Sequence, residues 1–203
     1  MEDILINVLT RTHNRPNLFK NCRDSVINQT YKNINHIVGS DGECNYHDGY
    51  IPLVLQKAVY PKPDRLASYE APWNLHLNEL AKQVKDGWIL YLDDDDKFVS
   101  LDAVQNIVNN IVDEDEVIFW RVNINGTLYP NDANFGKIIP GHISGIGFMF
   151  HSKHLPLVHW YSWNFGDYRV MMQLTQKLKQ RWLNSVHTQT QGRANHGTTP
   201  VNA

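Results

Sequence analysis

Cysteine pairs, basic segments and long apolar runs are all scarce in this sequence. Its 203 residues include two cysteines, Cys22 and Cys44, neither in a CxxC pair. A disulfide framework is therefore not supported, and a reducing compartment is the default expectation. The first segment, MEDILINVLT, lacks the basic region of a signal peptide, and its apolar run is too short to span a membrane. We therefore expect a cytoplasmic protein without a membrane span.

The charge is nearly balanced and carries no basic stripe. Nineteen lysines and arginines face 21 aspartates and glutamates, which gives a net charge of −2. Because the basic residues are scattered, nucleic acid is not an expected partner. Hydrophobic residues make up 42% of the chain, so a real core is possible. The length suits one domain, and we find no linker or repeat, so we expect residues 1–203 to form a single domain.

The first 40 residues have the pattern of a strand, a helix and a second strand. Ile4–Leu9 is a short apolar strand, and apolar residues at four-residue spacing predict a helix over Pro16–Asn28. Ile34–Val38 is the next strand. A strand–helix–strand unit of this length implies a parallel pair joined by a right-handed crossover.

The rest of the chain continues the alternation and then turns antiparallel. Asn125-Gly126 between apolar runs is a strong hairpin signal, and we assign Trp73 and Trp88 to the core. The further elements that the sequence predicts are a strand over Ile51–Leu55, a helix over Trp73–Val84, a strand over Trp88–Leu92, a helix capped by Ser100, a strand in HISGIGFMF, a helix over Gly166–Arg181 and a strand over Trp182–Thr188. The fold class is therefore α/β, with a parallel first part and an antiparallel later part.

The segment WILYLDDDDKF places four consecutive aspartates, Asp93 to Asp96, at the end of a buried strand. Carboxylates this close repel one another, so the run needs a reason other than stability. Ligands of open α/β sheets bind beyond the carboxyl ends of the strands. The polar segments Thr10–Asn14 and Ser40–Gly42 also follow strands, so the three strand ends would face one crevice. Carboxylate oxygens without a nearby cysteine suit Mg²⁺ or Mn²⁺, which commonly pair with a substrate's phosphates.

The four aspartates have three other possible interpretations. The run could simply be a solvated loop. A calcium loop of the EF-hand type fails, because Phe98 and Val104 occupy the positions of its glycine and its bidentate acid. A phosphatase-like D-x-D-x-[T/V] segment fits Asp93 and Asp95 but has Lys97 at its last position.

The combined motifs resemble family 2-type GT-A glycosyltransferases. The stretch LTRTHNRPNLFKNCRDSVINQTYKNINHIVGSDGE is similar to their opening, which commonly reads IPTYNR…L…SVLNQTY…IIVVDDGS. YLDDDDKF resembles their FLDADD segment, which holds the D-x-D motif, and GDYRVMMQL resembles their late acidic motif. The likeness is strongest over Ile4–Glu43 and Trp88–Phe98. The family's proline and tyrosine are Arg11 and His13 here, and its late acidic pair is reduced to Asp167.

The resemblance implies a GT-A fold: a Rossmann-like three-layer α/β/α sandwich with a mostly parallel mixed sheet. It also implies a nucleotide-sugar donor, often a UDP-sugar, a bound Mn²⁺ or Mg²⁺ ion, and an inverting displacement onto a glycan, glycolipid or glycoprotein acceptor. Carried over position by position, the residues expected at the nucleotide are Thr10, Arg11, Thr12, Arg15, Asp41, Asp93 and Asp94, and those at the metal are Asp93 and Asp95.

The later residues would complete the catalytic site. Asp167 is the expected general base, although an acid in the first turn of a helix also serves the helix dipole. His196 is the expected last metal ligand, with His187 as the alternative. Sugar C–H groups pack well on aromatic rings, so the expected acceptor residues are Trp160, Trp163 and His142, with Ser144 beside them. The alternative for the tryptophans is a core cluster.

Two other functions remain open at this point. A metal-dependent phosphohydrolase would release phosphate without a sugar acceptor. A non-catalytic nucleotide-sugar-binding module would bind a donor without turnover. The sequence leaves open the sugar, the acceptor and the oligomeric state.

Overall fold

The computed structural model describes residues 4–54 and 61–191. Its elements in chain order are β1 (Ile6–Thr12), α1 (Pro16–Ile27), β2 (Ile34–Ser40), β3 (Ile51–Pro52), the 3₁₀ helix η1 (Pro72–Asn74), α2 (Leu75–Ala81), β4 (Trp88–Tyr91), β5 (Asp96–Phe98), α3 (Ala103–Val108), β6 (Glu116–Ile124), β7 (Thr127–Tyr129), η2 (Asp132–Asn134), β8 (Phe148–His151), η3 (Ser152–Leu157), α4 (Gly166–Thr175) and β9 (Lys179–Thr190).

The strands of the described residues form one mixed sheet with the order β3-β2-β1-β4-β8-β6-β9-β5, and β7 pairs with β6. The first four strands of this order run parallel, which confirms the predicted strand–helix–strand unit. The sheet turns antiparallel at β8, while β6 and β9 are parallel. The sheet is therefore parallel in its N-terminal part and mixed beyond it, as the sequence predicted.

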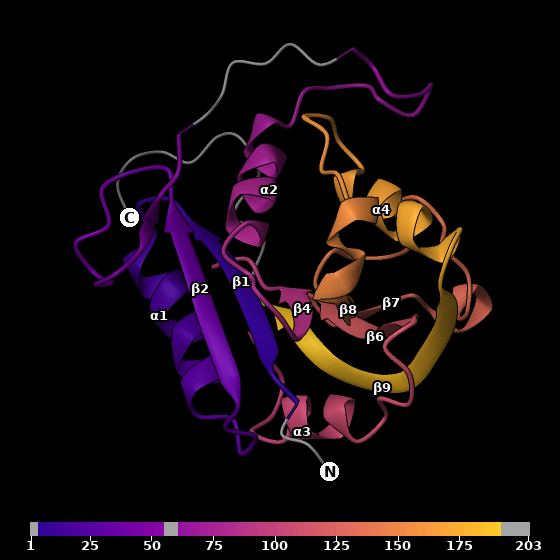
Figure 1. The fold of residues 1–203 in the computed structure, drawn as a ribbon, viewed down its shortest axis with the longest axis horizontal. Helices are drawn as coiled ribbons and strands as arrows, with labels where there is room; N and C mark the ends of the chain where they lie inside the picture. The colour runs from indigo at the N-terminus through magenta and orange to yellow at the C-terminus, as the bar shows by residue number, and fades with distance from the viewer. Residues whose placement is uncertain (1–3, 55–60, 192–203) are drawn as a thin grey trace.

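Helices cover both faces of this sheet (Figure 1). Buried side chains of α1 and α3, such as Cys22 and Val104, pack in one apolar cluster, and those of α2 and α4, such as Leu80 and Val170, pack in another. The two clusters lie on opposite faces because neighbouring strand residues, such as Val8 and Leu9, point to opposite sides. These three layers confirm the predicted α/β/α sandwich.

Cys22 lies on the buried apolar side of α1. Cys22 is fully buried among the residues that contact the sheet, and it is a free thiol. Burial raises the pKa of its thiol well above the ordinary value. Cys22 is therefore a reduced core residue, as predicted.

The hairpin prediction is also confirmed. Asn125 and Gly126 both have positive φ angles, 51° and 86°, between β6 and β7. Two successive residues with positive φ characterise the type I′ turn, whose twist matches that of the flanking strands.

Several predicted boundaries were wrong because distant contacts decide them. The last helix ends at Thr175 instead of Arg181, because Lys179 and its successors pair with β6. The strand in HISGIGFMF is limited to β8, since the preceding glycines form turns. Likewise, β1 runs on to Thr12 through its pairing with Ser40.

The helix capped by Ser100 was also predicted wrongly. The helix begins at Ala103, and the carbonyl oxygen of Ser100 instead accepts a hydrogen bond from Gln29 Nε2 at 2.8 Å. The cap comes from the same glutamine, whose Oε1 accepts from the backbone N–H of Val104 at 3.0 Å. The N–H of the first turn is therefore bonded to a residue that follows α1, 75 residues earlier in the chain, which no local pattern shows.

Two further predictions were too long. The predicted helix over Trp73–Val84 begins as the short η1 and ends at Ala81. The predicted strand over Ile51–Leu55 is limited to β3, and Leu55 lies outside the described residues. Trp88 is in the core, as expected, whereas Trp73 lines a cavity.

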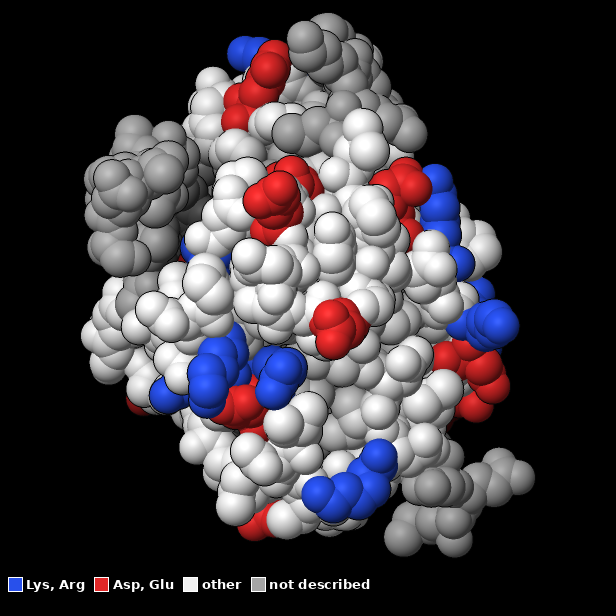
Figure 2. Space-filling model, turned by 90° about the vertical axis from the view of Figure 1, so that its left-hand side faces the viewer, with Lys and Arg blue, Asp and Glu red and all other residues white. Residues whose placement is uncertain are grey.

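The surface charge is mixed on the face nearest α1. Figure 2 shows lysine and arginine side chains interspersed with acidic ones there, with no continuous basic band on that face. Among the described residues, no helix combines the length and the apolar character that crossing a membrane would require.

Candidate active site

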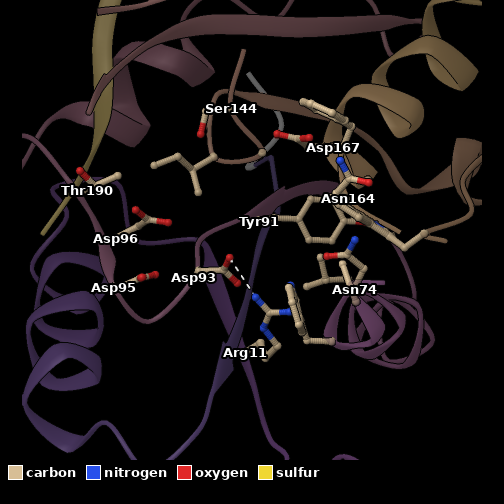
Figure 3. Close-up of a pocket in the computed structure, with 18 of the residues that line it drawn as sticks. Arg11, Asn74, Tyr91, Asp93, Asp95, Asp96, Ser144, Asn164, Asp167 and Thr190 are labelled. Carbon is tan, nitrogen blue, oxygen red and sulfur yellow. Dashed lines mark hydrogen bonds and ion pairs between the residues drawn. The ribbon is translucent and has the colours of Figure 1, made fainter. Parts of the chain in front are cut away.

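A cavity of about 200 Å³ lies where the two parts of the sheet meet. Its lining comes from the ends of β1 and β4, the turn before β8, the start of α4 and the end of β9. Figure 3 shows side chains from these segments around one space, and it labels Arg11, Asn74, Tyr91, Asp93, Asp95, Asp96, Ser144, Asn164, Asp167 and Thr190.

Three of the four aspartates form an acidic cluster at this cavity. One carboxylate oxygen each from Asp93, Asp95 and Asp96 lies within 4.8 Å of the other two. Burial, and then the neighbouring carboxylates, raise the pKa of Asp96 well above its ordinary value. Oxygen donors at this spacing suit a hard divalent cation such as Mg²⁺ or Mn²⁺. The sequence selected Asp93 and Asp95 for this role and missed Asp96.

The fourth aspartate, Asp94, does not line the cavity. Its fully buried carboxylate accepts from Thr12 Oγ1 at 2.7 Å and from Arg15 Nε at 3.0 Å. Burial raises the pKa of Asp94 to about 7, although Arg15 and Thr12 oppose the rise. Thr12, Arg15 and Asp94, all expected at the nucleotide, are therefore bonded to one another behind the turn.

Two more of the expected nucleotide residues lie outside the cavity lining. Thr10 is buried, and its hydroxyl donates to the carbonyl oxygen of Leu92 at 2.8 Å. Asp41 comes directly after β2, and its Oδ1 is 2.9 Å from Nδ1 of His13. The end of β2 lies at the same edge of the sheet as the end of β1.

Arg11 does line the cavity. Its Nη2 donates to Asp93 Oδ2 at 3.3 Å. Its Nη1 is buried and has no hydrogen-bond partner within the described part of the chain. A buried guanidinium with a free donor is costly unless an acceptor arrives, and a phosphate oxygen is the acceptor that Arg commonly binds.

Asp167 lines the opposite side of the cavity, in the first turn of α4. The residue before the helix, Phe165, has a left-handed φ of 58°, which is strained for an aromatic residue. A side chain at Gly145 would place its Cβ 3.3 Å from that of Asp167, so the turn before β8 passes close to this acid. Asp167 Oδ1 also accepts from the backbone N–H of Tyr168 at 2.8 Å.

Two asparagines in the wall of the cavity were not anticipated. Asn74 donates through Nδ2 to the carbonyl oxygen of Trp163 at 3.0 Å, and Asn164 Oδ1 accepts from the backbone N–H of Ser68 at 2.9 Å. These bonds join segments about 90 residues apart. Only the folded chain brings these segments together, so no local sequence pattern predicts that the two asparagines line the cavity.

The predicted acceptor residues are separated in the structure. Trp160 lines the cavity, edge-on to Tyr91 with 5.0 Å between the ring centroids. Trp163 and His142 do not line it: the Trp163 ring lies 5.4 Å from Lys62 Nζ, and His142 is exposed in a loop. Tyr91 and Thr190, which the sequence did not single out, line it instead.

The two histidines considered for the metal are not in the acidic cluster. His196 lies outside the described residues. His187 is buried, its Nε2 lies 2.7 Å from Ser185 Oγ, and its ring is edge-on to Trp120. Burial lowers the pKa of His187 to about 4, so its ring is neutral near pH 7.

Solved structures with a similar fold include TarS and a mannosyltransferase. TarS of S. aureus superposes with a TM-score of 0.67 at 10% identity, over 92% of this chain and 36% of TarS. TarS 1–349 in complex with UDP superposes with a TM-score of 0.64 at 13% identity, over 92% of this chain and 60% of that one. The mannosyltransferase PcManGT from Pyrobaculum calidifontis, in complex with GDP-Man and Mn²⁺, superposes with a TM-score of 0.63 at 13% identity. The match covers 95% of this chain and 58% of PcManGT.

This chain therefore spans 36% to 60% of the length of these structures. No curated protein sequence matches it. The profile of glycosyl transferase family 2, however, matches residues 8–137, which is well over half of the chain and includes the acidic turn. The strand order, the cavity and this match agree, and the chain belongs to glycosyl transferase family 2.

Proposed function

We propose that this enzyme is an inverting glycosyltransferase that takes a sugar from a nucleotide-diphosphate donor, with a UDP-sugar favoured, in the presence of Mn²⁺ or Mg²⁺. One observation carries the proposal: the acidic cluster and Asp167 line the same cavity from opposite parts of the sheet. A cavity of about 200 Å³ is small for a whole nucleotide-sugar and suits its sugar part. The nucleotide would then extend along the sheet edge toward Asp41.

The acidic cluster is the binding part of this site. Asp93, Asp95 and Asp96 would hold the divalent cation, because three close carboxylates are hard oxygen donors whose repulsion a cation relieves. A bound cation supplies Lewis-acid stabilisation of the negative charge on the departing diphosphate. Arg11 supports the same role, since its unpaired Nη1 can donate to a phosphate oxygen.

Asp167 would act as the general base. In the proposed step, the acceptor hydroxyl oxygen forms a bond to the anomeric carbon of the sugar while the bond from that carbon to the diphosphate oxygen breaks. The hydroxyl proton passes to the Asp167 carboxylate, and the electron pair of the broken bond leaves with the nucleoside diphosphate. Attack from the side opposite the leaving group inverts the anomeric configuration. A positioned general base typically contributes about 10²–10⁴-fold to such a rate.

The charges around the cavity favour an uncharged sugar. Four carboxylates line it, those of Asp93, Asp95, Asp96 and Asp167. Among the described residues of this lining, Arg11 is the one cationic side chain, and it already contacts Asp93. A sugar with its own carboxylate would meet repulsion from Asp167 after the cation and the diphosphate have balanced the acidic cluster. The aromatic edge of Trp160 would instead contact C–H groups of a neutral donor or of a glycan, glycolipid or glycoprotein acceptor.

Calorimetry and product analysis test the proposal. Titration of UDP-glucose, UDP-N-acetylglucosamine and GDP-mannose, each with and without Mn²⁺, should show at least one donor whose binding requires the cation. Nuclear magnetic resonance of the product should then show the opposite anomeric configuration. Retention of configuration would contradict the single displacement. Binding without turnover on any acceptor would favour a non-catalytic module, and phosphate release without an acceptor would favour a phosphohydrolase.

A further inference from the structure

One amide side chain, that of Gln191 at the end of β9, holds the acidic turn from behind. Its Nε2 donates to the carbonyl oxygens of Asp94 at 3.3 Å and Asp96 at 3.1 Å, and to that of Leu18 in α1 at 3.1 Å. Its backbone N–H donates to the carbonyl oxygen of Asp95 at 2.7 Å. Gln191 therefore contacts three successive peptide units of the turn and ties them to a helix.

The orientation of this amide is fixed by its surroundings. The NH₂ group faces three carbonyl oxygens, and a flipped amide would direct its own oxygen at all three. Gln191 Oε1 is buried and has no hydrogen-bond partner among residues 4–54 and 61–191. The amide therefore acts on the turn through its donors.

The turn needs such support because its side chains repel one another. Inside the turn, one backbone bond, from Asp96 N to Asp93 O at 2.9 Å, holds the two ends together. One carboxylate oxygen each from Asp93, Asp95 and Asp96 lies within 4.8 Å of the other two. Arg11 at Asp93 and Arg15 at Asp95 offset only part of this repulsion, so the turn would lower its energy by spreading. The bonds from Gln191 fix the peptide units on both sides of Asp95 and oppose this movement.

We propose that Gln191 is a positioning residue of the cation site, which keeps the three carboxylates at ligand spacing before the cation arrives. This inference rests on the proposed function, because it requires that the acidic cluster binds a divalent cation. Groups that orient metal ligands typically contribute about 10–100-fold to metal affinity.

The test uses the full chain and two matched variants. Gln191→Met keeps the length of the side chain and removes its donors. Gln189→Met is the control: Gln189 is two residues away on β9, and no side-chain hydrogen bond is found for it among the described residues. Mn²⁺ is titrated into each protein with and without UDP, and thermal unfolding is measured in EDTA. We expect the Mn²⁺ Kd to rise about tenfold in Gln191→Met and less than twofold in Gln189→Met.

A lower melting temperature with an unchanged Mn²⁺ Kd in Gln191→Met would show a purely structural role and overturn the inference. Equal weakening in both variants would overturn it as well. If Gln191→Met does not fold, Gln191→Asn decides: its amide is one methylene shorter, and an unchanged Kd there would contradict the proposal. A wild-type chain that binds no Mn²⁺ would instead contradict the cation site itself.

Discussion

The two walls of the cavity come from regions of the molecule that are organised differently. The N-terminal wall, with Arg11 and the acidic turn, belongs to parallel strands whose carboxyl ends meet at one edge. The C-terminal wall, with Ser144 and Asp167, consists of a turn before an antiparallel strand and the start of α4. These two parts lie side by side in Figure 1 and meet where β4 pairs with β8.

The difference parallels the division of roles that we propose. Topology alone gathers the residues of the N-terminal wall, since every parallel strand delivers its following polar residues to the same edge. The C-terminal wall depends on particular local geometry, the left-handed Phe165 and the close passage of Gly145 beside Asp167. We assign donor binding to the first wall and proton transfer to the second.

Asp95→Asn is the strongest test of the N-terminal wall. The substitution removes one charged ligand of the acidic cluster, so binding and leaving-group stabilisation are both lost. We expect transfer to fall about 10³–10⁴-fold, since cation stabilisation is worth several kcal/mol. Mn²⁺-dependent donor binding, measured by calorimetry, should disappear. Donor binding at the wild-type level would show that the cluster does not hold the cation.

Asp167→Asn tests the C-terminal wall in the same way. We expect kcat to fall about 10²–10⁴-fold because the acceptor proton loses its base. Donor affinity should change little, and this separates the two walls. Asp86→Asn is the control, because Asp86 is on the surface and away from the cavity lining. A normal kcat in Asp167→Asn would assign the base to another group.

Arg15→Met tests how much the buried ion pair of Arg15 contributes to the stability of the N-terminal wall. The variant removes the charged partner of buried Asp94 and also the contact of 3.4 Å between Arg15 Nη1 and Asp95 Oδ2. We expect the free energy of unfolding to fall by about 2 kcal/mol, less than for a fully buried pair because Arg15 is partly exposed and Asp94 can take up a proton. Urea denaturation measures it. Arg23→Met, which removes a surface ion pair with Asp24, should cost about 0.5 kcal/mol or less.

A comparison of a neutral and an acidic donor sugar tests both walls together. UDP-glucose should bind about tenfold more tightly than UDP-glucuronate, because the carboxylate of the latter faces Asp167 across the cavity. Competition binding in the presence of Mn²⁺ measures the ratio. Since Asp167→Asn removes the opposing charge, it should reduce the difference. A preference for the acidic donor would contradict the proposed orientation of the sugar.

The smallest effect is expected at His187, behind the C-terminal wall on β9. Its folded pKa is about 4, below the ordinary 6.5, so the unfolded chain binds its proton first as the pH falls. Stability from this group is therefore complete above about pH 6.5 and declines toward pH 4. Relative to His187→Gln, the wild type should lose about 1 kcal/mol between pH 7 and 5.5.

Urea denaturation at both pH values measures this change. His36, whose pKa burial also lowers to about 4, is present in both proteins and cancels. A constant difference between the two proteins would show that the His187 ring can be protonated in the folded state.

The sequence was a good guide wherever the deciding forces are local. Apolar periodicity identified α1, and Asn125-Gly126 identified the hairpin, because side-chain spacing and backbone preference act within a few residues. It was a poor guide to boundaries set by distant partners. The cap of α3 comes from Gln29, and the start of β9 is set by β6.

The same division holds within the site. The sequence alone determined that four aspartates end a buried strand at an edge where parallel strands gather, since strand period and chain order fix that place. Only the tertiary structure decided which of the four face the cavity. Local chemistry does not distinguish residues of one type, so their placement depends on what packs behind them. Arg15 and Thr12 bind Asp94 behind the turn, and Gln191 binds the backbone of the turn whose other three aspartates line the cavity.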